Sequence, residues 1–73
     1  MTHSRDAAIL LIGNELLSGR VADENLAYLA RELWKLGVPV RQARIVRDET
    51  EPIAEAVRLL SESHGWVFTS GGV

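Results

Sequence analysis

A run of six apolar residues, Ala7–Ile12, constrains the fold of this chain more than any other segment. It stands between Asp6 and Gly13 and does not alternate with polar residues, which is the pattern of a strand buried on both faces. Spanning a membrane takes about 20 apolar residues, so the run is far too short for that. It therefore predicts a central strand of a parallel sheet that is covered on both sides.

Two amphipathic segments predict helices. In Asp23–Leu36 the apolar side chains fall three and four positions apart, at Leu26, Leu29, Ala30, Leu33 and Trp34. Asp23 is expected to cap the start of this helix and Gly37 to end it. Thr50 is expected to cap a second helix before Pro52. The apolar stripe of this second helix is Ile53, Ala56, Val57 and Leu60.

Two further segments predict strands. Val38–Val46 alternates imperfectly and suits a less buried strand nearer an edge, whereas Trp66–Thr69 suits a buried strand. The predicted elements therefore alternate along the chain in the order strand, helix, strand, helix, strand. This order favours parallel strands joined by right-handed crossovers. The predicted fold class is α/β, with a three-layer, doubly wound, mostly parallel sheet. Trp34 and Trp66 are expected to lie in the core or to pack between helix and sheet. Residues 1–73 are expected to be the first half of a single larger domain.

Composition excludes several functional classes. With 47% hydrophobic residues and a net charge of −2, the 73-residue chain is globular rather than disordered. It has no cysteine, which excludes disulfides and thiolate metal sites and fits the cytoplasm. Its basic residues are dispersed, and it shows no secretory signal. Neither a nucleic acid nor a membrane is therefore expected as a partner.

Two glycine-bearing loops that follow apolar runs predict a binding crevice. They are Gly13–Gly19, after the first strand, and Ser70–Gly72, after the last. Loops from the carboxyl ends of neighbouring parallel strands converge on a ligand, and loops of this composition present backbone N–H groups to an anion. The plain alternative for Ser70–Gly72 is a turn that needs glycine only for its geometry.

Three polar side chains near these loops are candidates for chemistry. Asp48 ends the second strand, where one carboxylate oxygen can hold Mg²⁺ while the metal bridges phosphates; alternatively, it begins a turn. Glu15 can accept protons from a ligand or assist a metal, or it caps a short local turn. Asn25 can hydrogen-bond across to the glycine loop, or it is an ordinary residue of a helix start.

Five short motifs stand in order along the chain: Ile12–Gly19, Asp23–Asn25, Leu36–Val38, Val46–Asp48 and Thr69–Val73. In this order and spacing they resemble the MoaB/Mog-type molybdopterin-binding family, and most closely the amino-terminal domain of CinA-like, competence/damage-inducible proteins. The chain departs from the family pattern at Glu24, where the family has threonine. The acidic pair that follows the glycines in the family has no counterpart in this chain.

The resemblance implies a metal-dependent reaction at a pyrophosphate bond, of ADP-ribose pyrophosphatase type, with Asp48 as catalytic residue and metal ligand. It implies Mg²⁺ or another divalent cation, and molybdopterin or a nucleotide (ADP-ribose or ATP) as ligand. Molybdopterin adenylyl transfer is the alternative reaction, and a non-catalytic ligand-sensing module is the alternative of another class. A homo-oligomer, dimer or trimer, is expected. The implied cofactor-binding residues are Gly13, Asn14, Glu15, Asn25, Ser70, Gly71 and Gly72.

Overall fold

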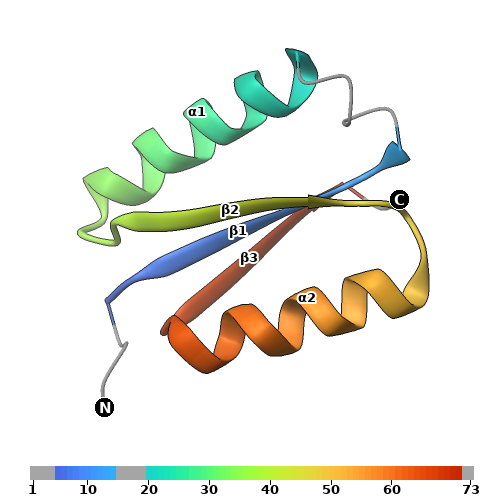
Figure 1. Ribbon diagram of the computed structural model, residues 1–73. Coiled ribbons are helices and arrows are strands. Elements are labelled where there is room, and N and C mark those ends of the chain that lie inside the picture. The colour runs from blue at the N-terminus through green and yellow to red at the C-terminus, as the bar shows by residue number, and fades with distance from the viewer. Residues whose placement is uncertain (1–4, 15–19, 72–73) are drawn as a thin grey trace.

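The computed structural model describes residues 5–14 and 20–71, the side chains of 20–23 excepted, and strands and helices alternate along it (Figure 1). The elements are β1 (Ala7–Ile12), α1 (Arg20–Lys35), β2 (Val40–Val46), α2 (Thr50–Ser63) and β3 (Trp66–Gly71). The α/β order expected from the sequence is confirmed.

The three strands form a parallel sheet in the order β2-β1-β3. At its carboxyl end, Ile12 of β1 is paired with Val46 of β2 on one side and with Gly71 of β3 on the other. All six residues of β1 are buried, whereas β2 has exposed residues in its middle. The unbroken apolar run therefore predicted the central strand correctly, and the alternating segment predicted the strand beside it, which starts at Val40 and not at Val38. The prediction that Trp66–Thr69 is a buried strand is wrong, because β3 has only exposed and partly buried residues and Trp66 is 50% exposed.

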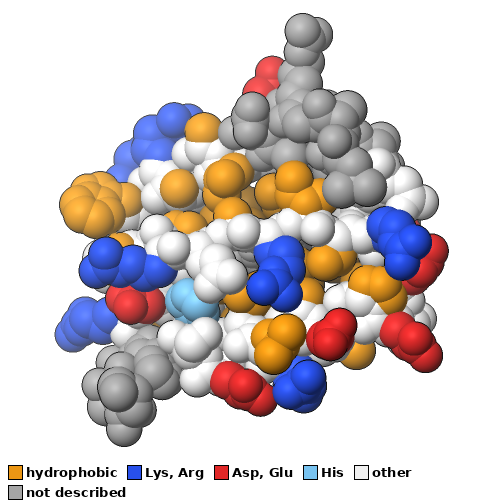
Figure 2. Space-filling model, viewed as in Figure 1, with side chains coloured by type: hydrophobic (Ala, Val, Ile, Leu, Met, Phe, Trp, Pro, Cys, Tyr) orange, Lys and Arg blue, Asp and Glu red, His pale blue; other side chains and the backbone are white. Residues whose placement is uncertain are grey.

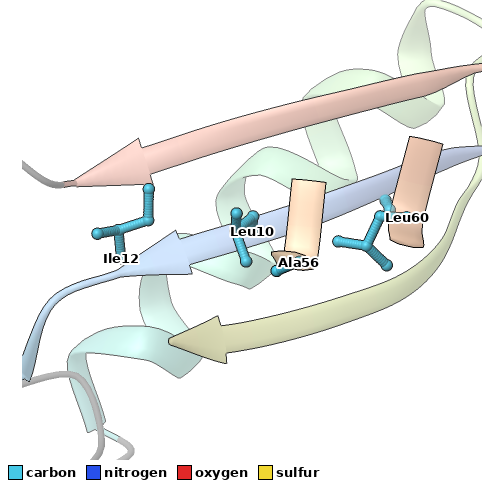
Figure 3. Packing of buried hydrophobic residues seen from close by; sticks show 5 residues of the cluster. Leu10, Ile12, Ala56 and Leu60 are labelled. Carbon is cyan, nitrogen blue, oxygen red and sulfur yellow. The ribbon is translucent and has the colours of Figure 1, made fainter. Parts of the chain in front are cut away.

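In the described chain one helix lies on each face of the sheet (Figure 1). Successive residues of β1 point to opposite faces, so this one strand supplies two cores. The core under α2 consists of Ala8, Leu10, Ile12, Ala56 and Leu60 (Figure 3). The core under α1 is built on Ile9, Leu11 and Leu33. Two covered faces explain why β1 lacks polar alternation.

The helix starts differ from the prediction. α1 begins at Arg20, so Asp23 lies inside the helix and not at its cap. The extended residue before α2 is Glu49, whose side chain makes no capping hydrogen bond, and Thr50 is already helical. The capping role predicted for Thr50 is therefore wrong. Pro52 is tolerated because the first N–H groups of a helix have no partner within it.

The end of α1 matches the prediction, but Trp34 does not. Gly37, at φ +80°, ends the helix, and its N–H donates to the carbonyl oxygen of Trp34 at 3.0 Å. Trp34 is 71% exposed because the neighbouring Leu33 is the residue buried against the sheet. Figure 2 shows hydrophobic and basic side chains together on the left, where the strands start in Figure 1.

Candidate functional site

The carboxyl ends of the strands bring together residues that are far apart in the sequence. Gly13 and Asn14 follow β1, Asp48 follows β2, and Ser70 and Gly71 end β3. These ends lie level because the last residue of β1 is paired with both neighbouring strands. The amino ends of α1 and α2 lie at the same edge (Figure 1). Doubly wound sheets bind ligands at this edge.

Two hydrogen bonds join the segments that follow β1 and β2. The N–H of Gly13 donates to the carbonyl oxygen of Val46 at 3.1 Å. The N–H of Asp48 donates to the side-chain oxygen of Asn14 at 3.3 Å. Asn14 and Asp48 are both exposed. The backbone of Asp48 is therefore held beside Asn14, and the exposed side chain of Asp48 is open to a ligand.

Two residues predicted to lie in a loop after the last strand are instead part of β3. Ser70 and Gly71 belong to the strand, paired with Leu11 and Ile12 of β1, and are not part of a separate loop. Gly71 has a φ of +92°, and a Cβ atom there would overlap the carbonyl oxygen of Ile12. Glycine at this position therefore lets two backbones approach closely. Its role toward an anion stays a prediction.

Of the other predicted site residues, the structure describes only Asn25, and it does not bring Asn25 into this group. Asn25 lies in α1 and is partly buried, and within the described part of the chain no hydrogen bond joins its side chain to the strand ends. Glu15 and Gly72 lie outside the described residues. The structure thus gathers Gly13, Asn14, Asp48, Ser70 and Gly71 at one edge.

A hollow of about 550 Å³ beside Asp48, at the start of α2, was missed from the sequence. Arg47 lines it, with its Nη2 atom 3.3 Å from the carboxylate oxygen of Glu49. Glu49 therefore cancels the net charge of Arg47, although both side chains are exposed and the contact itself is weak. The signal available in the sequence was the spacing of three glutamates over the start of the second helix. The remaining lining residues are Thr50, Glu51, Pro52 and Glu55.

Asp48 suits a metal that is shared with a ligand. Among the described residues, no group of three or more histidine, cysteine, aspartate or glutamate side chains could hold a metal ion. Mg²⁺ is commonly held by one or two carboxylates together with substrate phosphates. The exposed carboxylate of Asp48 at the edge of the sheet fits this arrangement. The residues present are therefore compatible with a Mg²⁺ ion that binds together with a phosphate.

The parallel sheet, its two covering helices and the polar strand ends define a doubly wound α/β domain with a ligand-binding edge. This chain belongs to the family described as "Probable molybdopterin binding domain", whose model matches residues 8–73. The family resemblance inferred from the five motifs is thereby confirmed. Neither described helix is long and apolar enough to cross a membrane.

Similar proteins extend well beyond the matched region. The crystal structure of the protein CinA, of unknown function, from Thermoplasma acidophilum matches with a TM-score of 0.89 and 32% identity, over 99% of this chain and 43% of that one. A CinA-like protein from Thermomicrobium roseum is 40% identical over 93% of this chain and 17% of its own length. A probable FAD synthase from Caenorhabditis elegans is 40% identical over the whole chain and 14% of its own length.

Proposed function

We propose that this domain binds the diphosphate of an adenine nucleotide at the carboxyl edge of the sheet, and that the protein carrying it hydrolyses ADP-ribose. The observation that supports this most directly is the hydrogen bond from the Asp48 N–H to the Asn14 side chain, 3.3 Å long. It holds an exposed carboxylate next to the loop of Gly13, which lies one strand away from Gly71. The Gly13 N–H already donates to the Val46 carbonyl oxygen, so we assign the phosphate contacts to other backbone N–H groups of the two glycine segments.

The charges at this edge favour a divalent cation as part of the complex. Among the described side chains there, the basic group is Arg47, and it is paired with Glu49 at 3.3 Å. Asp48 adds a negative charge that would repel a diphosphate. Mg²⁺ held by Asp48 would supply charge neutralisation and Lewis-acid polarisation of the phosphoryl group. Asp48 therefore acts as a ligand of the shared cation, and the glycine segments hold and orient the phosphates.

The reaction is an ordinary hydrolysis. The oxygen of water forms a bond to one phosphorus atom of ADP-ribose, and the bond from that phosphorus to the bridging oxygen breaks. The products are AMP and ribose 5-phosphate, and the proton released from water passes to solvent. A phosphorylated pterin would present the same phosphate oxygens to the same edge, so it is the second ligand to test.

The test uses the full-length protein, incubated with ADP-ribose and MgCl₂ and analysed by chromatography for AMP and ribose 5-phosphate. Asp48→Ala should lose product formation and bind the ligand at least tenfold more weakly, because it removes the metal ligand. Asp6→Ala is the matched control. It removes an exposed carboxylate from the opposite end of the sheet, where its 3.5 Å contact with Arg41 is worth little.

The outcomes separate the classes of function. AMP formation that Asp48→Ala abolishes and Asp6→Ala retains would support the hydrolase. Tight binding of ADP-ribose or a phosphorylated pterin without any product would instead make the domain a ligand-sensing module. If neither ligand binds to the folded protein, the proposal fails.

Nucleotidyl transfer is a second candidate, supported by two relatives named probable FAD synthase, from Caenorhabditis elegans and Caenorhabditis briggsae, at 40% and 41% identity. In this case the AMP group of ATP would be transferred to a phosphate of the acceptor, and pyrophosphate would be released. Incubation with MgATP and either FMN or molybdopterin, with pyrophosphate as the readout, tests it. Pyrophosphate release that depends on the acceptor would favour transfer over hydrolysis.

A further inference from the structure

The side chain of Asn14 has two chemically different ends, and the structure determines which end faces Asp48. A backbone N–H can only donate, so the group that accepts from the Asp48 N–H at 3.3 Å is the amide oxygen Oδ1. The amide nitrogen Nδ2 therefore keeps both of its N–H donors. Within the described residues, no hydrogen bond uses them.

This contact continues the pairing of β1 and β2 beyond the strands. The Gly13 N–H donates to the Val46 carbonyl oxygen at 3.1 Å, and this is a backbone pair. The next contact along, at Asp48, uses a side chain as acceptor. In a regular parallel ladder a backbone carbonyl would take that place. Backbone hydrogen bonds hold the chain on either side of Asp48, at Val46 and between Glu49 and Arg47, whereas the partner of the Asp48 N–H itself, among the described residues, is this one side chain.

We propose that Asn14 is the positioning residue for Asp48, an inference that rests on the proposed function. Its oxygen fixes the Asp48 backbone so that the carboxylate meets the cation and phosphates of the ligand. Its nitrogen, on the opposite side of the same planar amide, donates to an oxygen of the anionic ligand. Asparagine suits both tasks, because aspartate would keep the acceptor but lose the donors and add a negative charge.

The first test is hydrogen exchange in the full-length protein, followed by mass spectrometry of peptides that cover residues 47–50. Asn14→Leu should speed exchange of the Asp48 amide about threefold to tenfold, the loss expected for one exposed hydrogen bond. Asn14→Asp should restore slow exchange because it keeps an acceptor oxygen. Gln42→Leu is the matched control, since it removes an exposed amide side chain from the middle of β2.

The second test is a double-mutant cycle on the affinity for ADP-ribose with Mg²⁺, measured by calorimetry. Asn14→Leu should weaken binding about tenfold in the wild-type background. It should weaken binding only about threefold in the Asp48→Ala background, where the loss of the Nδ2 donor alone still counts. A residue that acts through Asp48 must show this coupling.

Two results would overturn the inference: an unchanged exchange rate at Asp48 in Asn14→Leu, or an equal loss of affinity in both backgrounds. Failure of the proposed function is recognised separately, since the folded wild-type protein would then not bind ADP-ribose, or Asp48→Ala alone would leave its affinity for ADP-ribose unchanged. If Asn14→Leu fails to fold, Asn14→Asp and Asn14→Ala carry the same exchange comparison. Slow exchange in both of these variants would also overturn the inference.

Discussion

The two ends of this sheet are both hollowed, yet their chemistry is opposite. The carboxyl end gathers small polar and glycine residues beside a hollow of about 550 Å³. The amino end carries exposed large apolar side chains, Trp34 at 71% and Leu36 at 76%, beside hollows of about 440 and 370 Å³. Hollow size therefore does not identify the ligand site. Small polar groups orient a phosphate, whereas exposed apolar surface suits contact with another macromolecule.

The largest effect should come from adding a methyl group to a glycine at the carboxyl end. Gly71→Ala adds a Cβ atom that overlaps the Ile12 carbonyl oxygen, on a backbone with φ +92°. Strain of this kind costs about 1–3 kcal/mol, and the overlap adds to it. We expect a clearly lower free energy of unfolding, measured with denaturant, and a loss of ADP-ribose binding.

Gly37→Ala at the amino end is the matched control for this substitution. Gly37 also has a positive φ, of +80°, but no atom lies within 4 Å of its added Cβ. The Gly37→Ala variant should lose about 1 kcal/mol of unfolding free energy, the cost of a left-handed backbone at a residue with a Cβ atom. Its affinity for ADP-ribose should stay unchanged. If the two variants are equally stable, the close approach of β3 to β1 is not the reason why position 71 requires glycine.

The next largest effect should follow removal of divalent cations. The attraction between unit charges about 4 Å apart is about 4 kcal/mol near a protein surface, and the described basic group at this edge, Arg47, is already paired. Chelation with EDTA should therefore weaken ADP-ribose binding to the full-length protein at least tenfold by calorimetry. Adenosine, which lacks phosphates, should bind equally well with and without EDTA. Equal affinities for ADP-ribose with and without EDTA would show that the site does not use a divalent cation.

A smaller effect is expected at the end of β3. Ser70 is partly buried and paired with Leu11, at the edge where the phosphates are proposed to lie. Ser70→Ala should weaken ADP-ribose binding about threefold to tenfold, the value of one hydrogen bond, with little change in melting temperature. Thr69→Val, which removes a hydroxyl one residue earlier, should leave the affinity unchanged. A loss shared by both variants would point to damage to the strand instead.

The sequence predicted the parts of this comparison that depend on local pattern. The unbroken run Ala7–Ile12 predicted a central strand because burial on both faces leaves no room for alternation. The stripe of α2 predicted its buried residues, Ala56 and Leu60. Parallel pairing of the three strands was enough to place Gly13, Asp48 and Gly71 at the same edge.

Tertiary contacts decided what the sequence did not predict. Glu49 and not Thr50 precedes α2 because the bend after β2 leaves Glu49 extended and Thr50 helical, and the residue types do not fix where that bend ends. Trp34 and Leu33 are both apolar neighbours in one helix, and only the position of the sheet selects Leu33 for burial. The ligand, the metal and the expected homo-oligomer stay predictions, which light scattering and the binding experiments above would test.

The smallest effect is expected at the amino end, and it is the most direct test of the contrast between the two ends. Trp34→Ala removes the large exposed side chain beside Pro39 and Arg41. The six residues of β1 place this end about 20 Å from the carboxyl edge, so the affinity for ADP-ribose should change less than twofold. The free energy of unfolding should change by no more than about 0.5 kcal/mol, because the ring is mostly solvated. A threefold or larger loss of affinity would mean that the two ends are coupled through β1, and the polar strand ends could then no longer be treated as a self-contained site.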